Sequence, residues 1–146
     1  MPELSSSMEI ADALLTVIRL MRREIDIAMS TQGLSLARGK LLFTIEREGP
    51  TRPSTLANLL DQAPRSITDA IDALERDGLV ERRQDTTDRR AQLIALSPAG
   101  VKALRAAEKP KQKALEKFFA ALDESQKKNL LSALRTVGRD AESRNV

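Results

Sequence analysis

Apolar residues between Leu56 and Gly78 recur at the spacing of two short amphipathic helices separated by a tight turn. The first helix carries one apolar stripe, made of Leu56, Ala57 and Leu60. The second repeats its apolar residues at i, i+4 and i+7, so that they face inward together: Ile67, Ile71 and Leu74. Taken alone, this pattern also fits an ordinary helical hairpin in a core, and the residues that follow decide between the two.

Two short runs with partial alternation of apolar and polar residues follow the helix pair, at residues 79–83 and 91–96. Residues 84–90 between them are polar and turn-forming, and carry Arg89 and Arg90 side by side. An arginine at the tip of a hairpin can enter a narrow minor groove, where the potential is most negative. Asp88 is the candidate support for this wing, because it can hold Arg90. The order of elements predicts a winged helix-turn-helix, a module that reads duplex DNA.

The second helix of the pair is the predicted recognition helix. Pro64 suits its first turn, where a missing N–H costs nothing, and Gly78 is placed to end it. Its outward side carries short polar groups near the N-terminus, which suits entry into a major groove. The candidate DNA contacts are Pro64, Arg65, Ser66, Thr68, Asp69 and Asp72 on this helix, and Arg89 and Arg90 on the wing.

Carboxylates on a recognition helix need an explanation, because the phosphates of DNA repel them. From Arg65 to Asp77 two arginines stand against four acidic residues, a formal charge of −2. Asp69 lies one turn after Arg65, where it can orient that guanidinium toward guanine, or it can accept a hydrogen bond from cytosine N4 and repel other bases. The alternative is a solvated acid with no role in reading.

Two motifs after the recognition helix resemble those of the MarR (multiple antibiotic resistance regulator) family. Asp88-x-Arg90 is similar to the Asp-x-Arg element of the family's wing. Residues 96–100, Leu-Ser-Pro-Ala-Gly, are similar to the family's Leu-Thr-x-x-Gly, with Ser97 as a helix N-cap and Pro98 at the first helical position. Residues 33–50 resemble the helix before the helix-turn-helix, and residues 123–137 the start of the last helix, so the resemblance covers residues 8–142.

The resemblance implies a mainly α fold with a small β-wing (α+β), in which a winged helix-turn-helix is flanked by N- and C-terminal dimerisation helices. Residues 1–32 are then the N-terminal dimerisation helix, residues 33–98 the DNA-binding domain, and residues 99–146 the helices for connection and dimerisation. Apolar stripes along residues 8–29 and 111–142 cannot be buried in so small a module, so the two ends should pack on each other. The alternative is a monomer whose terminal helices fold over its own core.

For function, the resemblance implies a sequence-specific transcriptional regulator, a homodimeric repressor that binds a palindromic operator in double-stranded DNA. A small aromatic or phenolic effector is implied as the releasing ligand, and the residues that bind it are unknown. Two alternatives stay open: a winged-helix regulator without an effector, and a winged-helix protein-interaction module whose acidic helix faces a basic partner.

Four positions depart from the family's pattern: Asp61, Gln62, Ala63 and Asp69. Asp61 stands where the family's turn often has glycine, although aspartate tolerates a left-handed conformation better than most residues. Ala63 lacks a side-chain cap for the recognition helix, and Asp69 occupies a position where many relatives carry a basic residue. Pro110 is expected to kink or interrupt the helix that starts at Ser97.

Composition narrows the classes further. The chain has 146 residues, a net charge of +3, and neither cysteine nor histidine. Disulfides, thiol redox sensing and structural zinc are thereby excluded, and with no glycine-rich phosphate loop we expect neither an enzyme nor a cofactor. No apolar run reaches spanning length and no signal peptide is evident, so we expect a soluble cytoplasmic protein without a membrane partner. The basic run from Lys102 to Lys117 is interpreted as a solvated helix face.

Overall fold

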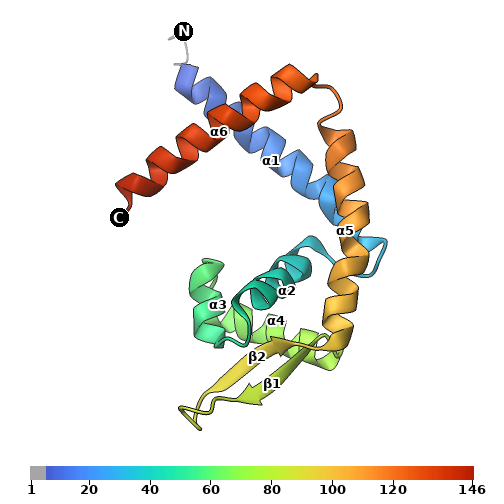
Figure 1. Cartoon of the computed structure of the whole chain (residues 1–146), viewed down its shortest axis with the longest axis vertical. Helices are drawn as coiled ribbons and strands as arrows, with labels where there is room; N and C mark the ends of the chain where they lie inside the picture. Colours follow the sequence, from blue (N-terminus) through green and yellow to red (C-terminus); the bar gives the residue numbers. More distant parts are fainter. Residues whose placement is uncertain (1–5) are drawn as a thin grey trace.

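The computed structural model of this chain describes residues 6–146, and this part contains six helices and one antiparallel two-stranded sheet (Figure 1). In chain order the elements are α1 (Ser6–Ser30), α2 (Leu36–Glu48), α3 (Pro53–Leu59), α4 (Pro64–Arg76), β1 (Val80–Gln84), β2 (Gln92–Leu96), α5 (Pro98–Phe118) and α6 (Glu124–Arg144). The predicted fold class, mainly α with a small β-wing, is confirmed. No helix among the described residues is long and apolar enough to cross a bilayer.

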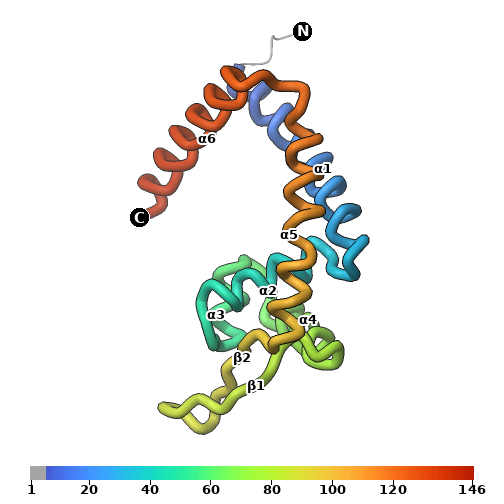
Figure 2. Tube along the Cα trace, turned by 45° about the vertical axis from the view of Figure 1, so that its right-hand side comes forward, coloured from blue at the N-terminus to red at the C-terminus, as the bar shows by residue number. Residues whose placement is uncertain are grey.

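The elements gather at two ends of an open shape. The helices α2, α3 and α4 and the hairpin β1–β2 form one unit, and α1 and α5 rise from it side by side (Figures 1 and 2). Beyond α5 the chain turns into α6, whose C-terminal half lies apart from the other elements in Figure 2. Since α6 has no buried residue, the alternative of terminal helices folded over their own core is wrong for this helix.

The core lies where the two apolar stripes of the helix-turn-helix meet α2 and the sheet. Leu56 of α3 and the three predicted residues of α4 are fully buried, as the spacing predicts. The largest fully buried side chains are Leu34, Leu42, Ile45, Leu56, Ile67, Ile71, Leu74 and Ile94. Because these residues come from α2, α3, α4, β2 and the segment before α2, this core fixes the position of α4.

The turn between α3 and α4 follows the sequence prediction. Asp61 has a φ of 51°, the left-handed conformation expected of a residue that replaces glycine here. Ala63 is the N-cap residue of α4 and gives no side-chain hydrogen bond, while Pro64 begins the helix. Within the described structure the first turn of α4 therefore has no side-chain cap at its N–H groups.

The first strand of the wing lies one residue later than predicted, and the second starts one residue later but ends at Leu96 as predicted. Val80 pairs with Leu96, and the register runs to Gln84 opposite Gln92. Leu79 stays outside β1 because its N–H donates to the carbonyl of Leu74, 2.9 Å away, at the end of α4. Thr51 adds a two-bond bridge to Ile94 on the other edge of β2, with N···O distances of 3.0 and 2.7 Å.

Ser97 joins the end of the wing to α5. Its Oγ accepts from the N–H of Gly100 at 3.0 Å, which confirms the predicted N-cap, and donates to the carbonyl of Gly78 at 2.5 Å. Position 100 has no room for a larger residue, because a Cβ there would lie 2.0 Å from the backbone oxygen of Leu79. The Leu-Ser-Pro-x-Gly motif thus sets how closely α5 approaches the end of α4.

The expected interruption at Pro110 is wrong. The helix α5 runs unbroken from Pro98 to Phe118 with Pro110 inside it. One proline removes a single ladder hydrogen bond, and the remaining bonds of this 21-residue helix carry it past that position. The predicted start of the last helix is confirmed, since Asp123 and Gln126 form a reciprocal capping box at the beginning of α6.

Candidate nucleic-acid interface

The helix α4 exposes one polar face opposite its buried stripe. Pro64, Arg65, Ser66, Thr68, Asp69 and Asp72 are all exposed. Thr68 donates its hydroxyl to the carbonyl of Pro64 at 3.0 Å, so the side chain stays close to the first turn. The candidate residues of this helix therefore lie together on a surface that begins at its uncapped N-terminus.

Arg65 and Asp69 do not pair with each other. Among residues 6–146, neither side chain forms an ion pair or a hydrogen bond. The expected one-turn pairing is thus absent from the free chain, and both groups face solvent with their charge uncompensated by direct contact. Of the four acidic residues counted on this helix, Asp69 alone is in this condition within the described structure.

The other acidic residues of α4 are engaged inside the fold. Arg82 of β1 contacts the carboxylates of Asp72 and Glu75, and Arg38 of α2 lies 2.5 Å from the carboxylate of Asp77. Sequence reasoning missed Arg82 as a partner of this helix. The signal was the excess of carboxylates on a helix predicted to approach phosphates, which demands compensating cations nearby.

The tip of the wing presents two arginines without protein partners. The guanidinium groups of Arg89 and Arg90 form no ion pair or hydrogen bond with residues 6–146, and both residues are exposed. Asp88 supports the turn through the backbone, because its Oδ1 accepts from the N–H of Arg90 at 3.0 Å. Its carbonyl also accepts from the N–H of Ala91 at 3.0 Å. The side chain of Arg90 thus stays free while its backbone is held.

A second carboxylate, which sequence reasoning missed, anchors the loop between the two strands of the wing. Asp85 is buried and its Oδ2 lies 2.8 Å from the guanidinium of Arg52, the N-cap residue of α3. Its Oδ1 accepts from the N–H and the hydroxyl of Thr87 at 2.9 and 2.8 Å. These bonds, the one from Arg52 above all, hold the pKa of the Asp85 carboxyl well below its usual range, and the same pair raises the pKa of Arg52.

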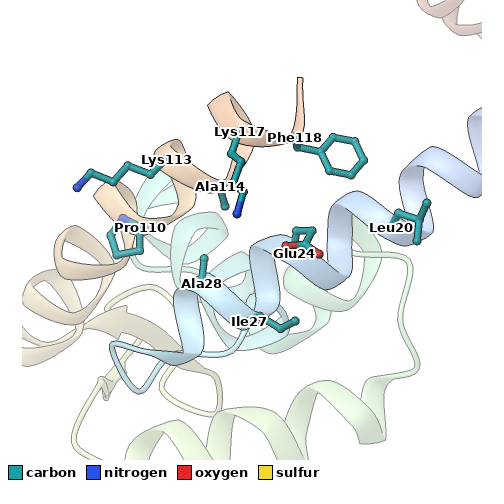
Figure 3. A pocket seen from close by; sticks show the side chains of 9 residues that line it. All are labelled: Leu20, Glu24, Ile27, Ala28, Pro110, Lys113, Ala114, Lys117 and Phe118. Atoms are coloured by element: carbon teal, nitrogen blue, oxygen red, sulfur yellow. The ribbon is translucent and has the colours of Figure 1, made fainter. Parts of the chain in front are cut away.

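Two cavities lie beside α1 and α5. A hollow of about 600 Å³ separates α1 from α5, with Glu24 of α1 facing the side of α5 that carries Lys113 and Lys117 (Figure 3). A second cavity of about 370 Å³ lies between α1, α2 and α5. Its lining is mostly apolar but includes three cations, Arg22, Lys40 and Lys111, and one carboxylate, Glu108.

Comparison with known proteins points to one family. The sequence profile of the MarR family matches residues 34–91. An uncharacterized HTH-type transcriptional regulator of Mycobacterium bovis is 31% identical over 123 residues, which are 84% of this chain and 85% of that protein. The transcriptional repressor MprA of Escherichia coli K12 is 29% identical over 104 residues, which are 70% of this chain and 59% of MprA.

Solved structures show the same fold at low identity. A mutant MarR from E. coli, solved as a complex with operator DNA, has a TM-score of 0.80 and 20% identity, covering 94% of this chain and 99% of that one. The organohalide-sensing regulator RdhR in its 2,4-dichlorophenol-bound form has a TM-score of 0.78 and 19% identity, covering 94% of this chain and 82% of that one. The arrangement of α4, the wing and the terminal helices is therefore a known architecture.

We expect Asp85→Asn to loosen the wing, because the substitution removes the negative charge that Arg52 contacts at the start of the loop between the two strands. Hydrogen exchange of the Thr87 amide should quicken by about threefold or more. Asp88→Asn is the matched control, since it removes the same charge but keeps an oxygen that accepts from the N–H of Arg90. Equal exchange in the parent and in Asp85→Asn at neutral pH would contradict the anchoring role.

The effect of Asp85→Asn has a defined pH dependence. Because the pKa of Asp85 is lowered in the folded chain, its stabilising contribution is fully present above its ordinary pKa of about 3.9. The contribution is then lost progressively as the pH falls below that value toward the folded pKa. The difference in exchange between parent and variant should accordingly shrink below about pH 4.

Proposed function

This chain belongs to the MarR family of transcriptional regulators, and we propose that it acts as a homodimeric repressor that reads a palindromic operator with α4 and the wing. The observation that carries the proposal is that two exposed surfaces, one on α4 and one on the wing, lie at the same end of the molecule. The exposed polar face of α4 begins at an uncapped N-terminus, and the arginines of the wing tip have no partner within residues 6–146. A recognition helix and a cationic wing are the two elements that a winged helix uses on duplex DNA.

The proposed contacts divide between the two grooves. Pro64, Arg65, Ser66 and Thr68 enter the major groove with the first turn of α4, where free N–H groups also suit a phosphate. Arg89 and Arg90 enter the flanking minor groove, where Asp88 keeps the turn in shape. Asp69 is the proposed specificity device, because an unpaired carboxylate on this face lowers affinity for every base except one that donates a hydrogen bond to it.

Dimerisation is proposed for the terminal helices, with residues 33–98 as the DNA-reading part and residues 1–32 and 99–146 as the parts that join two copies. Both α1 and α6 carry large apolar side chains at the surface, an arrangement that a second copy of the chain would cover. The most exposed along the two helices are Met8, Ile10, Leu15, Ile27, Leu131 and Val137. Two copies related by a two-fold axis would place two recognition helices about one turn of DNA apart, roughly 34–36 Å.

Regulation by a small aromatic or phenolic ligand is part of the proposal. The cavity between α1, α2 and α5 joins the DNA-reading unit to the proposed dimer helices, so a ligand there can favour one spacing of the two recognition helices. Its cations suit a phenolate or a carboxylate. Related structures support a DNA-bound and a ligand-bound state, because one MarR protein was solved with operator DNA and RdhR with 2,4-dichlorophenol. The relative MprA is named a transcriptional repressor, which supports repression as the effect on transcription.

One observation counts against a protein-interaction module with an acidic recognition helix. Three of the four carboxylates that such a partner would contact are already paired with arginines inside the chain: Asp72, Glu75 and Asp77. A basic partner would have to displace Arg82 and Arg38 to reach them. DNA remains the partner that the free charges of this end favour.

We expect Arg89→Ala and Arg90→Ala each to weaken binding to operator and to unrelated duplex DNA. An arginine in the minor groove contributes charge and shape readout, so the slope of log K against log salt should fall by about 1. Fluorescence anisotropy across a salt titration measures this slope, with Lys128→Ala on α6 as the control for loss of a remote charge. Binding as tight as that of the parent, at every salt concentration, would exclude the wing as a DNA element.

The proposed dimer predicts that Leu134→Asp on α6 separates the two copies. The side chain of Leu134 is 42% exposed in the single chain, so the substitution should not disturb the fold of one copy. Light scattering at micromolar concentration should give the mass of two chains for the parent and of one chain for the variant. Ser132→Asp, on another side of α6, should leave the dimer intact. A parent protein with the mass of one chain would refute the dimer.

Ligand release is tested with 2,4-dichlorophenol as the probe. Saturating amounts should lower the affinity of the protein for a labelled duplex that the parent selects from a random pool, because a ligand that prefers the unbound spacing shifts the population away from DNA. Lys111→Gln should reduce this response, whereas Lys128→Gln should leave it unchanged. If the probe binds the protein at the cavity and the affinity for DNA does not change, the cavity is not a regulatory site for this ligand.

A further inference from the structure

We propose that Arg82 is a positioning residue for DNA reading, which holds the carboxylates of Asp72 and Glu75 and thereby fixes the recognition helix against the wing. The proposal rests on the DNA-binding function proposed above. It concerns a residue outside the set of candidate contacts, in the middle of β1. Its role is to keep two acidic groups of α4 away from phosphate rather than to contact the duplex.

One guanidinium connects three elements. The Nη2 of Arg82 contacts Oδ1 of Asp72, and its Nε lies 3.2 Å from a carboxylate oxygen of Glu75, both on α4. Its Nη1 lies 3.4 Å from Oε1 of Gln92 on β2. Asp72 and Glu75 are three residues apart on the helix, so they lie on the same side and meet the same group. The planar guanidinium suits this use, because it donates in several fixed directions at once.

Burial distinguishes Arg82 from the cations of the wing tip. The side chain of Arg82 is 26% exposed, compared with 54% for Asp72 and 45% for Glu75. The cation is thus more sheltered than the anions it holds, whereas Arg89 and Arg90 are exposed and free of ion pairs within the described chain. A guanidinium whose nitrogens already donate to protein oxygens is poorly placed to donate to a phosphate as well.

The charge balance of α4 makes this pairing consequential. Without Arg82 the helix would present two further unpaired carboxylates beside the free carboxylate of Asp69. Unpaired charges act over roughly 8 Å at physiological ionic strength, which is enough to reach the phosphates beside a helix in the groove. With Arg82 in place, the charges of Asp72 and Glu75 are offset within the fold. The charged side chains of α4 that form no ion pair with residues 6–146 are then Arg65, Asp69 and Arg76.

The same contacts fix the angle between helix and wing. The chain passes from α4 to β1 through a tight turn at residues 77–79, in which Gly78 has a φ of 73°. Beyond this turn, Arg82 connects β1 to α4 a second time through its ion pairs with Asp72 and Glu75. A protein that reads the major groove with α4 and the minor groove with the wing needs both in fixed relation, because a tilt of one displaces the other from its groove.

The test is a double-mutant cycle on the affinity for a labelled duplex that the parent selects from a random pool. Arg82→Ala is measured in the parent and in the Asp72→Asn/Glu75→Gln background, where the carboxylates are replaced by neutral amides. If Arg82 acts through these carboxylates, its loss should weaken binding about tenfold in the parent and less than about threefold in the neutral background. If Arg82 contacts phosphate directly, the loss is equal in both backgrounds, and the proposal is overturned.

Two further variants sharpen the result. Arg83→Ala removes the neighbouring arginine of β1, which pairs with Glu81 at 3.5 Å, and should have the same effect in both backgrounds. Arg82→Lys keeps the charge but cannot bridge both carboxylates and Gln92. Its affinity for the duplex should therefore lie between that of the parent and that of Arg82→Ala. It replaces Arg82→Ala in the cycle if the alanine variant does not fold. A parent that selects no duplex would refute the proposed function, whereas an additive cycle in a parent that binds would refute only the role of Arg82.

Discussion

The contact between the end of α4 and the start of α5 is the constraint on which the rest of the molecule depends. Ser97 bonds Gly78 and Gly100 with one hydroxyl, and its N–H donates to the carbonyl of Leu79 at 3.1 Å. The absence of a Cβ at Gly100 lets the two segments approach. The direction in which α5 leaves the winged helix-turn-helix is therefore set at the C-terminal end of α4.

Charge pairing explains how an acidic recognition helix belongs to a DNA-binding protein. The formal charge of −2 between Arg65 and Asp77 suggests repulsion only if the carboxylates are free. Arg82 and Arg38, supplied by the wing and by α2, compensate those on the second half of the helix. Exposed pairs of this kind add little to stability, about 0.2–1 kcal/mol each. Their importance lies in which charges remain for the duplex.

Local patterns predicted most of the fold, because its elements depend on neighbours in sequence. The spacing of Ile67, Ile71 and Leu74, the left-handed turn at Asp61 and the cap at Ser97 are all properties of a few consecutive residues. The free arginines of the wing tip belong to the same class. The interruption expected at Pro110 was wrong, because the loss of one ladder hydrogen bond does not end a helix of 21 residues.

The partners of the candidate site could not be predicted from sequence, because they lie far apart along the chain. Arg52 and Asp85 are 33 residues apart, and Arg82 meets Asp72 only once the strand has turned back along the helix. A pattern of consecutive residues places each group on a surface but does not say which groups meet. The contacts that anchor the wing and neutralise the helix are therefore tertiary. They are also the contacts that decide which charges the winged helix presents to DNA.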